Sequence, residues 1–323
     1  MEDDLISVII CTKNRPELLL EAVDSVLAQT WRNWELIIVD DGSSESVEPL
    51  VSRHLKSQQA KFSFVRHEHS QGIAVARNVG VGNASGRYLY FLDDDDLLIN
   101  HSLQILLQTL QEFSLGCVFH NIRPFGKDAA SKADELVKAN SKVLSGISIK
   151  QPRKGVYVFE KDLFEGLLLS VPLSFQRFLV TRELWGISGG MRPAAKMPEP
   201  EWVVKVALLG KCGLLLESLG LWRVDGQNIF SLKEDEHKIQ SRVIDNMHSL
   251  VEFAENSEQV NAQEMRIIKQ ALCKAYFSLA WQYLEQNQRI CALSALYHSA
   301  LIQIGFEHFK LLVKLGLPKL EKS

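Results

Sequence analysis

Residues 6–44 read ISVIICTKNRPELLLEAVDSVLAQTWRNWELIIVDDGSS, and this stretch decides the fold class. Residues 6–10 form an apolar, largely β-branched run, which is typical of a strand buried on both faces of a parallel sheet. Pro16 suits the first position of a helix, and this helix is expected to reach about residue 29. Residues 34–39 repeat the buried-strand pattern and end in the turn-forming sequence DDGSS.

The same strand–helix alternation continues along the next 70 residues. A helix is expected at about 46–56, a strand at 62–66, a helix at about 73–83 and a strand at 88–92, followed by an amphipathic helix. Alternation of this kind predicts parallel strands joined by right-handed crossovers. We therefore predict an α/β fold with a mostly parallel sheet flanked by helices. Polar clusters at 12–15, 40–43 and 93–96 then fall at the carboxyl ends of strands, where such sheets bind ligands.

The change in sequence pattern along the chain divides it into three parts. Residues 1–115 carry the regular alternation, and residues 116–232 look less regular, with loops around several glycines and prolines. Residues 233–323 show helical periodicity and are predicted to form an all-α extension. Within it, residues 276–300 are spaced like one helix–turn–helix of the tetratricopeptide type, and a plain helical hairpin explains them equally well.

Composition excludes several classes of protein. The 323 residues are 46% hydrophobic and 23% charged, with 36 basic and 39 acidic side chains and a net charge of −3. These values exclude a disordered chain and argue against a nucleic-acid partner. Five scattered cysteines indicate neither a disulfide framework nor a zinc site. The acidic first residues and the lack of a long apolar run lead us to expect a cytoplasmic protein.

Four consecutive aspartates follow the strand at 88–92 without a break. Their repulsion costs on the order of 1 kcal/mol per close pair, which a bound cation removes. Extended geometry places Asp93 and Asp95 on one side and Asp94 and Asp96 on the other. Carboxylates select Mg²⁺ or Mn²⁺, and a pair of them suits a metal–diphosphate. The alternative is a solvated turn whose aspartates cap the next helix.

Two common nucleotide motifs are missing. The first strand is followed by CTKNRP instead of GxGxxG, and the chain has no Walker A sequence. A nicotinamide enzyme and a P-loop nucleotidase are therefore both disfavoured.

The stretches at 7–44 and 71–98 resemble the family 2 glycosyltransferases of the GT-A fold, closely over about 115 residues and loosely to about residue 230. The resemblance implies a Rossmann-like GT-A domain with its donor-binding half at 1–115 and its acceptor-binding half at 116–232. It also implies a UDP- or dTDP-sugar donor, Mn²⁺ or Mg²⁺, and transfer with inversion at the anomeric carbon.

The resemblance further implies roles for individual residues. Asp95 and Asp93 would hold the metal, and the segment after the first strand, the aspartate pair after the second and an Ala-Arg-Asn step would bind the donor. The implied donor-binding residues are Thr12, Asn14, Arg15, Asp40, Asp41, Arg77, Asp93 and Asp94. Alternatives remain for three of these residues. Arg77 would form a salt bridge to the acidic turn, Arg15 would be a surface charge, and Asn14 would cap a helix.

The catalytic base is expected at the start of a helix, where the family usually has Glu-Asp. The aligned pair here is Pro198-Glu199, so Glu199 is the first candidate base and Glu201 the second. The alternative is that both glutamates only favour a helix N-terminus. A second departure lies further on, where Asp225 replaces a histidine of the family. A cation ligand is one interpretation of Asp225, and an Asp-Gly turn is the favoured one.

We therefore expect an inverting, metal-dependent glycosyltransferase that acts in glycan or polysaccharide synthesis on a sugar, lipid-linked or protein acceptor. The alternatives are a nucleotidyltransferase and a catalytically degenerate binding or scaffold protein. For the C-terminal helices three uses stay open: packing on the catalytic domain, peripheral contact with the inner face of a membrane, and oligomerisation. All three possibilities depend on an apolar stripe that comprises Phe306, Phe309, Leu312 and Val313.

Overall fold

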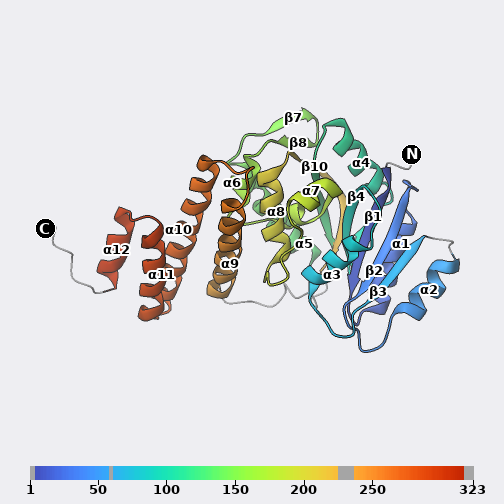
Figure 1. Ribbon diagram of the computed structural model, residues 1–323, viewed down its shortest axis with the longest axis horizontal. Helices are drawn as coiled ribbons and strands as arrows, with labels where there is room; N and C mark the ends of the chain where they lie inside the picture. The colour runs from blue at the N-terminus through green and yellow to red at the C-terminus, as the bar shows by residue number, and fades with distance from the viewer. Residues whose placement is uncertain (1–3, 58–60, 225–235, 316–323) are drawn as a thin grey trace. The chain divides into compact units, whose positions relative to one another are not determined.

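The computed structural model describes residues 4–57, 61–224 and 236–315 of the chain (Figure 1). The chain divides into two compact units, Met1–Ser231 and Leu232–Ser323, and each is described here by itself. Among the described residues, none of the helices combines the length and apolar character that crossing a bilayer requires. Asp225 lies outside the described residues, as do the side chains of Phe306, Phe309 and Val313.

One mixed sheet forms the centre of the first unit. Its strands lie in the order β3-β2-β1-β4-β9-β6-β10-β8-β7. β5 is not part of this series and pairs with β10. β1 to β4 are parallel to one another, whereas β9 runs antiparallel between β4 and β6. The strands are β1 (Ile6–Thr12), β2 (Trp34–Asp40), β3 (Phe62–Arg66), β4 (Tyr88–Asp93), β5 (Leu97–Leu98), β6 (Cys117–Phe125), β7 (Lys150–Arg153), β8 (Val156–Phe159), β9 (Phe178–Thr181) and β10 (Cys212–Arg223).

Helices cover both faces of the parallel strands, which is why these strands are apolar at consecutive positions. Even-numbered residues of β1, such as Val8, join the core beneath α1, α2 and α4. On the other face, α3 approaches β1 so closely that a Cβ on Gly80 would lie 2.5 Å from Cγ2 of Ile9. The helices are α1 (Pro16–Leu27), α2 (Glu48–Ser57), α3 (Ile73–Gly82), α4 (Ser102–Glu112), α5 (Ala129–Leu144), α6 (Leu163–Leu167), the 3₁₀ turn η2 (Leu173–Gln176), α7 (Arg182–Ile187) and α8 (Pro198–Leu209).

The predicted fold class is confirmed, but the second half of this unit is more regular than expected. It contributes β6 to β10 and α5 to α8 where the sequence shows a less regular pattern. The strands β7, β8 and β9 have only four residues each, which is too few to show an alternating pattern. Pro198 does not interrupt a helix here, because it occupies the first turn of α8.

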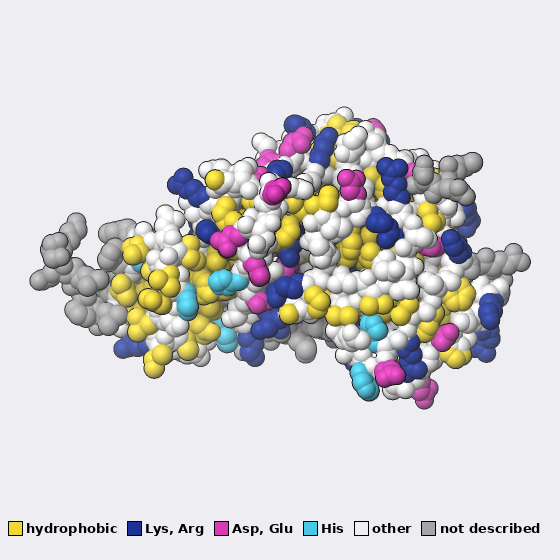
Figure 2. Space-filling view, viewed as in Figure 1, with side chains coloured by type: hydrophobic (Ala, Val, Ile, Leu, Met, Phe, Trp, Pro, Cys, Tyr) yellow, Lys and Arg dark blue, Asp and Glu magenta, His cyan; other side chains and the backbone are white. Residues whose placement is uncertain are grey.

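The described part of the second unit consists of α9 (Glu236–Glu255), α10 (Ala262–Glu285), α11 (Arg289–Ile302) and α12 (Phe306–Lys314). α10 begins with a capping box between Asn261 and Glu264. A three-residue connection then leads to α11, and Asn287 in it has a positive φ of 59°. α10 and α11 therefore form a helical hairpin. Large hydrophobic side chains of α11, such as Tyr297 and Leu301, are exposed, and hydrophobic side chains gather over this unit in Figure 2.

Candidate active site

The carboxyl ends of three strands meet at one edge of the sheet. β1 lies between β2 and β4, and its register pairs Thr12 with Asp40 and Cys11 with Asp93. The polar residues at the ends of these strands are therefore neighbours, although Thr12 and Asp94 are 82 positions apart in the chain. This edge holds most of the candidate site residues.

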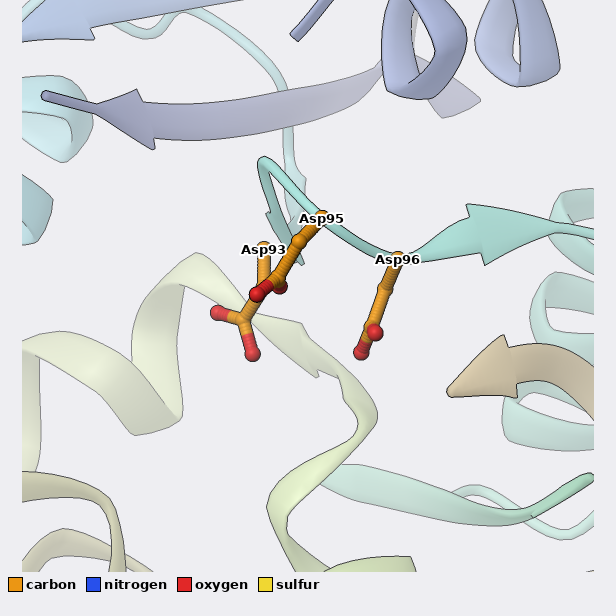
Figure 3. Close-up of side chains that lie close together, drawn as sticks. All are labelled: Asp93, Asp95 and Asp96. Atoms are coloured by element: carbon orange, nitrogen blue, oxygen red, sulfur yellow. The ribbon is translucent and has the colours of Figure 1, made fainter. Parts of the chain in front are cut away.

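Three of the four consecutive aspartates form one cluster. A carboxylate oxygen from each of Asp93, Asp95 and Asp96 lies within 4.8 Å of the others, and their side chains point to the same side in Figure 3. The expected strict alternation is wrong for Asp96. β4 ends at Asp93 and the chain turns, with the amide of Asp96 donating to the carbonyl oxygen of Asp93 at 3.2 Å. The turn brings Asp96 to the side of Asp93 and Asp95.

Asp94 faces the loop after β1 instead. Its Oδ2 accepts a hydrogen bond of 2.7 Å from Thr12, and its Oδ1 lies 3.1 Å from Nη1 of Arg15. The same Nη1 donates to Oδ2 of Asp95 at 3.0 Å. Burial and the neighbouring Asp95 raise the pKa of Asp94 to about 6, against the opposing effects of Thr12 and Arg15. Arg15 thus forms a bridge to the acidic turn and is not a free surface charge.

Asp93 lies between two buried guanidinium groups. Arg77 donates to its Oδ1 at 2.7 Å, and Arg177 donates to its Oδ2 at 2.6 Å. Burial favours a higher pKa for Asp93, but Arg177 and Arg77 outweigh it and hold the pKa below its usual range. For Asp95, burial together with the charge of Asp93 outweighs the opposing effects of Arg15 and Arg177 and raises the pKa.

Arg77 also reaches the first candidate base. Its Nη1 contacts Oε1 of Glu199, in the first turn of α8, while its Nη2 holds Asp93. Glu199 is therefore brought to the acidic cluster, and the side chain is 17% exposed. The salt bridge expected as the alternative role of Arg77 is present, and it joins two candidate site residues.

Glu201 is not brought to the cluster. It is 3% exposed, and its carboxylate accepts hydrogen bonds from Nε of Arg192 at 3.0 and 3.1 Å and from Nζ of Lys205 at 3.0 Å. One turn of helix separates it from Lys205, so this pair is favoured by local geometry. These contacts indicate a structural role for Glu201.

Asp41, directly after β2, is enclosed by the loop between β3 and α3. Asp41 accepts four hydrogen bonds, from the side chains of His67 and Ser70 and from the amides of Gln71 and Gly72, at 2.6 to 3.0 Å. Burial opposes ionisation, but these donors lower the pKa of Asp41 to about 2. A carboxylate has about four acceptor sites, so these donors satisfy it. His67 is itself buried.

Asp40 and Asn14 also connect loops. Asp40 is fully buried, and its Oδ1 accepts a bond of 2.8 Å from the amide of Ser43. Asn14 has a positive φ of 56°, and its side-chain oxygen accepts a bond of 2.8 Å from the amide of Ser44. Asn14 is not the helix cap considered above, because Arg15 occupies that position and its side chain makes no capping bond.

Two arginines near the aspartates were missed by the sequence reasoning. Arg177 binds Asp93 and Asp96, and the backbone amide of Arg223 donates to Oδ1 of Asp96 at 3.1 Å. The only signal for Arg177 is a charged residue directly before the apolar strand FLV. The side chains of Trp185 and Trp202 are only 6% and 1% exposed, so both tryptophans belong to the core of the unit.

Comparison of sequences identifies the N-terminal region. The model of the family described as Glycosyl transferase family 2 matches residues 7–152. An uncharacterized glycosyltransferase of Rickettsia conorii is 34% identical over 171 residues, which cover 51% of this chain and 28% of that protein. UDP-Glc:alpha-D-GlcNAc-diphosphoundecaprenol beta-1,3-glucosyltransferase WfgD of Escherichia coli is 32% identical over 121 residues, covering 38% of this chain and 47% of that protein. The chain thus spans less than half the length of these curated relatives.

Solved structures agree with this fold. Residues 1–349 of S. aureus TarS superpose with a TM-score of 0.64 at 14% identity, covering 96% of this chain and 87% of that chain. The mannosyltransferase PcManGT from Pyrobaculum calidifontis, in complex with GDP-Man and Mn²⁺, gives a TM-score of 0.57 at 17% identity, covering 95% and 78%. Taken with the sequence match over residues 7–152, the sheet order and these likenesses show a GT-A fold whose N-terminal part is similar to the family 2 glycosyltransferases.

Proposed function

We propose that the chain is an inverting, metal-dependent glycosyltransferase that moves a sugar from a nucleotide-diphospho-sugar to an acceptor hydroxyl in glycan or polysaccharide synthesis. The observation that carries this proposal is the guanidinium of Arg77, which contacts both Asp93 and Glu199. One guanidinium thus joins the candidate base to an aspartate of the candidate metal site. A single displacement needs both groups near one anomeric carbon, with the base on the side of the attacking hydroxyl.

The acidic cluster fits a hard divalent cation. Its donors are carboxylate oxygens, which suit Mn²⁺ or Mg²⁺. Within the run of four, Asp93 and Asp95 are the more accessible, with side chains 30% and 17% exposed, whereas those of Asp94 and Asp96 are 8% and 5% exposed. We assign Asp93 and Asp95 as the residues that would hold the ion. When bound, such an ion neutralises charge that develops on the leaving diphosphate.

The protein's own side chains divide the remaining work. Glu199 accepts the proton of the attacking hydroxyl, and Arg77 fixes one of its oxygens so that the carboxylate keeps its orientation. Thr12 and Arg15 hold Asp94 and align the acidic turn against the end of β1. Asp40, Asp41 and Asn14 shape the adjoining loops, where we place the nucleotide base.

The names of the relatives indicate a class of donor and acceptor. WfgD is named as a glucosyltransferase that uses UDP-Glc, and a 36% identical relative from Campylobacter jejuni is named GalNAc(5)-diNAcBac-PP-undecaprenol beta-1,3-glucosyltransferase, over 33% of this chain and 35% of that protein. One TarS structure contains UDP-GlcNAc. We infer a UDP-sugar donor, with a dTDP-sugar as the second choice, and a lipid-linked sugar acceptor. An acceptor of this kind would bring the enzyme to the cytoplasmic face of a membrane.

The two glutamates of α8 test the assignment of the base. Glu199→Gln should lower kcat for sugar transfer by roughly 100-fold to 10,000-fold, because it removes the proton acceptor, while donor binding measured by calorimetry stays within about threefold. Glu201→Gln is the matched control from the same helical turn. It should lower the melting temperature by leaving Arg192 and Lys205 less well paired, and retain kcat in the folded fraction. Equal losses of kcat in both variants would contradict Glu199 as the base.

A further inference from the structure

Arg177 is a buried cation to which the mechanism above assigns no task. It directly precedes β9, the antiparallel strand inserted between β4 and β6, and its side chain is 8% exposed. Its Nη2 donates to Oδ2 of Asp93 at 2.6 Å and to Oδ2 of Asp96 at 2.7 Å, and its Nε donates to the same Asp96 oxygen at 3.2 Å. One guanidinium therefore joins the first and last aspartates of the run.

The geometry points to Arg177 and Asp96 as a positioning pair that sets the carboxylate of Asp93 for the divalent cation. This inference rests on the proposed function, because it concerns the same metal site. Arg177 is a positioning residue and not a catalytic one, since its contacts lead to carboxylates and its burial keeps it from the substrate.

Asp96 provides the fixed end of this arrangement. Its Oδ1 accepts a hydrogen bond of 3.1 Å from the backbone amide of Arg223, at the end of β10, and its Oδ2 receives Arg177. A carboxylate held at both oxygens in the interior has little freedom to rotate. Asp96 thus anchors Arg177 to the sheet, and Arg177 in turn fixes one oxygen of Asp93.

The contacts continue from Asp93 to the candidate base. Asp93 Oδ1 accepts from Arg77, and Arg77 contacts Glu199, so negative and positive groups alternate from Asp96 to Glu199. If the hold of Arg177 is lost, Asp93 is left with Arg77 as its guanidinium partner. We expect its carboxylate to turn toward Arg77 and away from Asp95, which would separate the two oxygens that the ion needs.

The planar fork of arginine is essential to this role. Arg177 addresses two carboxylates with donors in fixed directions, whereas a lysine carries one point charge on a flexible stem. Arg177→Lys therefore keeps the positive charge but loses the simultaneous hold on Asp93 and Asp96. Residues that orient metal ligands typically change metal affinity by roughly 10-fold to 100-fold when they are replaced.

The opposite end of the same strand offers a matched control. Arg182 directly follows β9, and its Nε donates to the carbonyl oxygen of Gly86 at 2.7 Å, before the start of β4. It has the same residue type and borders the same strand, but it lies at the amino end of β4, away from the aspartates. Arg182→Lys therefore measures the general effect on stability and binding of replacing an arginine next to β9.

The experiment titrates Mn²⁺ into the full chain with UDP present and follows UDP binding by calorimetry, in the wild type, Arg177→Lys, Arg177→Met and Arg182→Lys. Melting temperatures and kcat with UDP-glucose are recorded for the same samples. We expect both Arg177 variants that fold to need at least about tenfold more Mn²⁺ for half-saturation, with metal-free UDP affinity changed less than about twofold. Arg182→Lys should keep the wild-type Mn²⁺ requirement.

Two results would overturn the inference, and they differ from each other. Wild-type Mn²⁺ half-saturation in Arg177→Lys, with only a lower melting temperature, would leave Arg177 a purely structural residue while the proposed function stands. Absence of Mn²⁺-dependent binding of both UDP and dTDP in the wild type itself would remove the proposed function and this inference together.

Discussion

Asp93 and Asp41 both lie at the ends of strands, but their surroundings suit them to different roles. The two oxygens of Asp93 accept hydrogen bonds from Arg77 of α3 and from Arg177, directly before β9, and the side chain is 30% exposed. The two oxygens of Asp41 are satisfied by four donors, two of them backbone amides of its neighbouring loop. The first carboxylate is thus available to an ion, and the second stabilises a loop.

Asp41 makes a pH-dependent contribution to stability. Its folded pKa is about 2, below the usual value of 3.8, so its contribution is present above pH 4 and is lost as the pH falls through about 2. Asp41→Asn should lower the free energy of unfolding by roughly 2 kcal/mol at pH 7 and by clearly less at pH 2.5. Urea unfolding of both proteins at the two pH values measures this difference.

Glu68→Gln is the control for that experiment, because Glu68 is exposed in the same loop. It should change the free energy of unfolding by less than about 0.5 kcal/mol at either pH. If Asp41→Asn costs the same at pH 7 and at pH 2.5, the ionised carboxylate is not what stabilises the loop.

At the scale of elements, α3 depends on a close approach to the sheet. A Cβ on Gly80 would meet Cγ2 of Ile9 at 2.5 Å, whereas one on Gly82, two residues later in the same helix, would meet nothing within 4 Å. Gly80→Ala should therefore cost about 1–3 kcal/mol of stability through overpacking. Gly82→Ala should be neutral or stabilise by up to about 1 kcal/mol.

Denaturant unfolding of these two variants separates packing from helix propensity. Because α3 carries Arg77, a shift of this helix should also weaken UDP binding in Gly80→Ala and leave it unchanged in Gly82→Ala. Equal stability of the two variants would mean that α3 can move away from β1 at little cost.

Elements with many residues could be predicted from the sequence, and contacts between distant short elements could not. The buried runs at residues 6–10 and 34–39 identify parallel strands because both faces are covered, and parallel strands bring their polar ends together. Asp96 was misplaced because a turn replaces the strand after Asp93. Arg177 was missed because a four-residue strand shows no pattern and its partner Asp93 is 84 positions away.

The choice between the two candidate bases also could not be predicted from the sequence. The N-terminus of α8 was expected to hold the base, but periodicity alone does not decide which of two glutamates turns toward the aspartates. Glu201 has a lysine four residues later and is drawn into that pair, which leaves Glu199 to Arg77. The choice depends on partners from α3 and from the loop before α8, and these become neighbours only in the folded chain.

At the scale of the whole molecule, the first unit, Met1–Ser231, contains the candidate donor site, the candidate metal ligands and the candidate base. The helical unit Leu232–Ser323 carries exposed hydrophobic side chains on α11 but none of the candidate site residues. Sugar transfer should therefore depend on carboxylates of the first unit, whatever the helices contact.

The most direct test is Mn²⁺-dependent release of the nucleoside diphosphate from UDP-glucose, UDP-GlcNAc, dTDP-glucose and GDP-mannose by the full chain. The wild type should release it from at least one UDP- or dTDP-sugar. Asp95→Ala or excess chelator should lower the rate at least about 100-fold, while Asp134→Ala, which removes an exposed aspartate of α5, should not. Release that persists in Asp95→Ala and in chelator, or no release from any donor, would contradict the account.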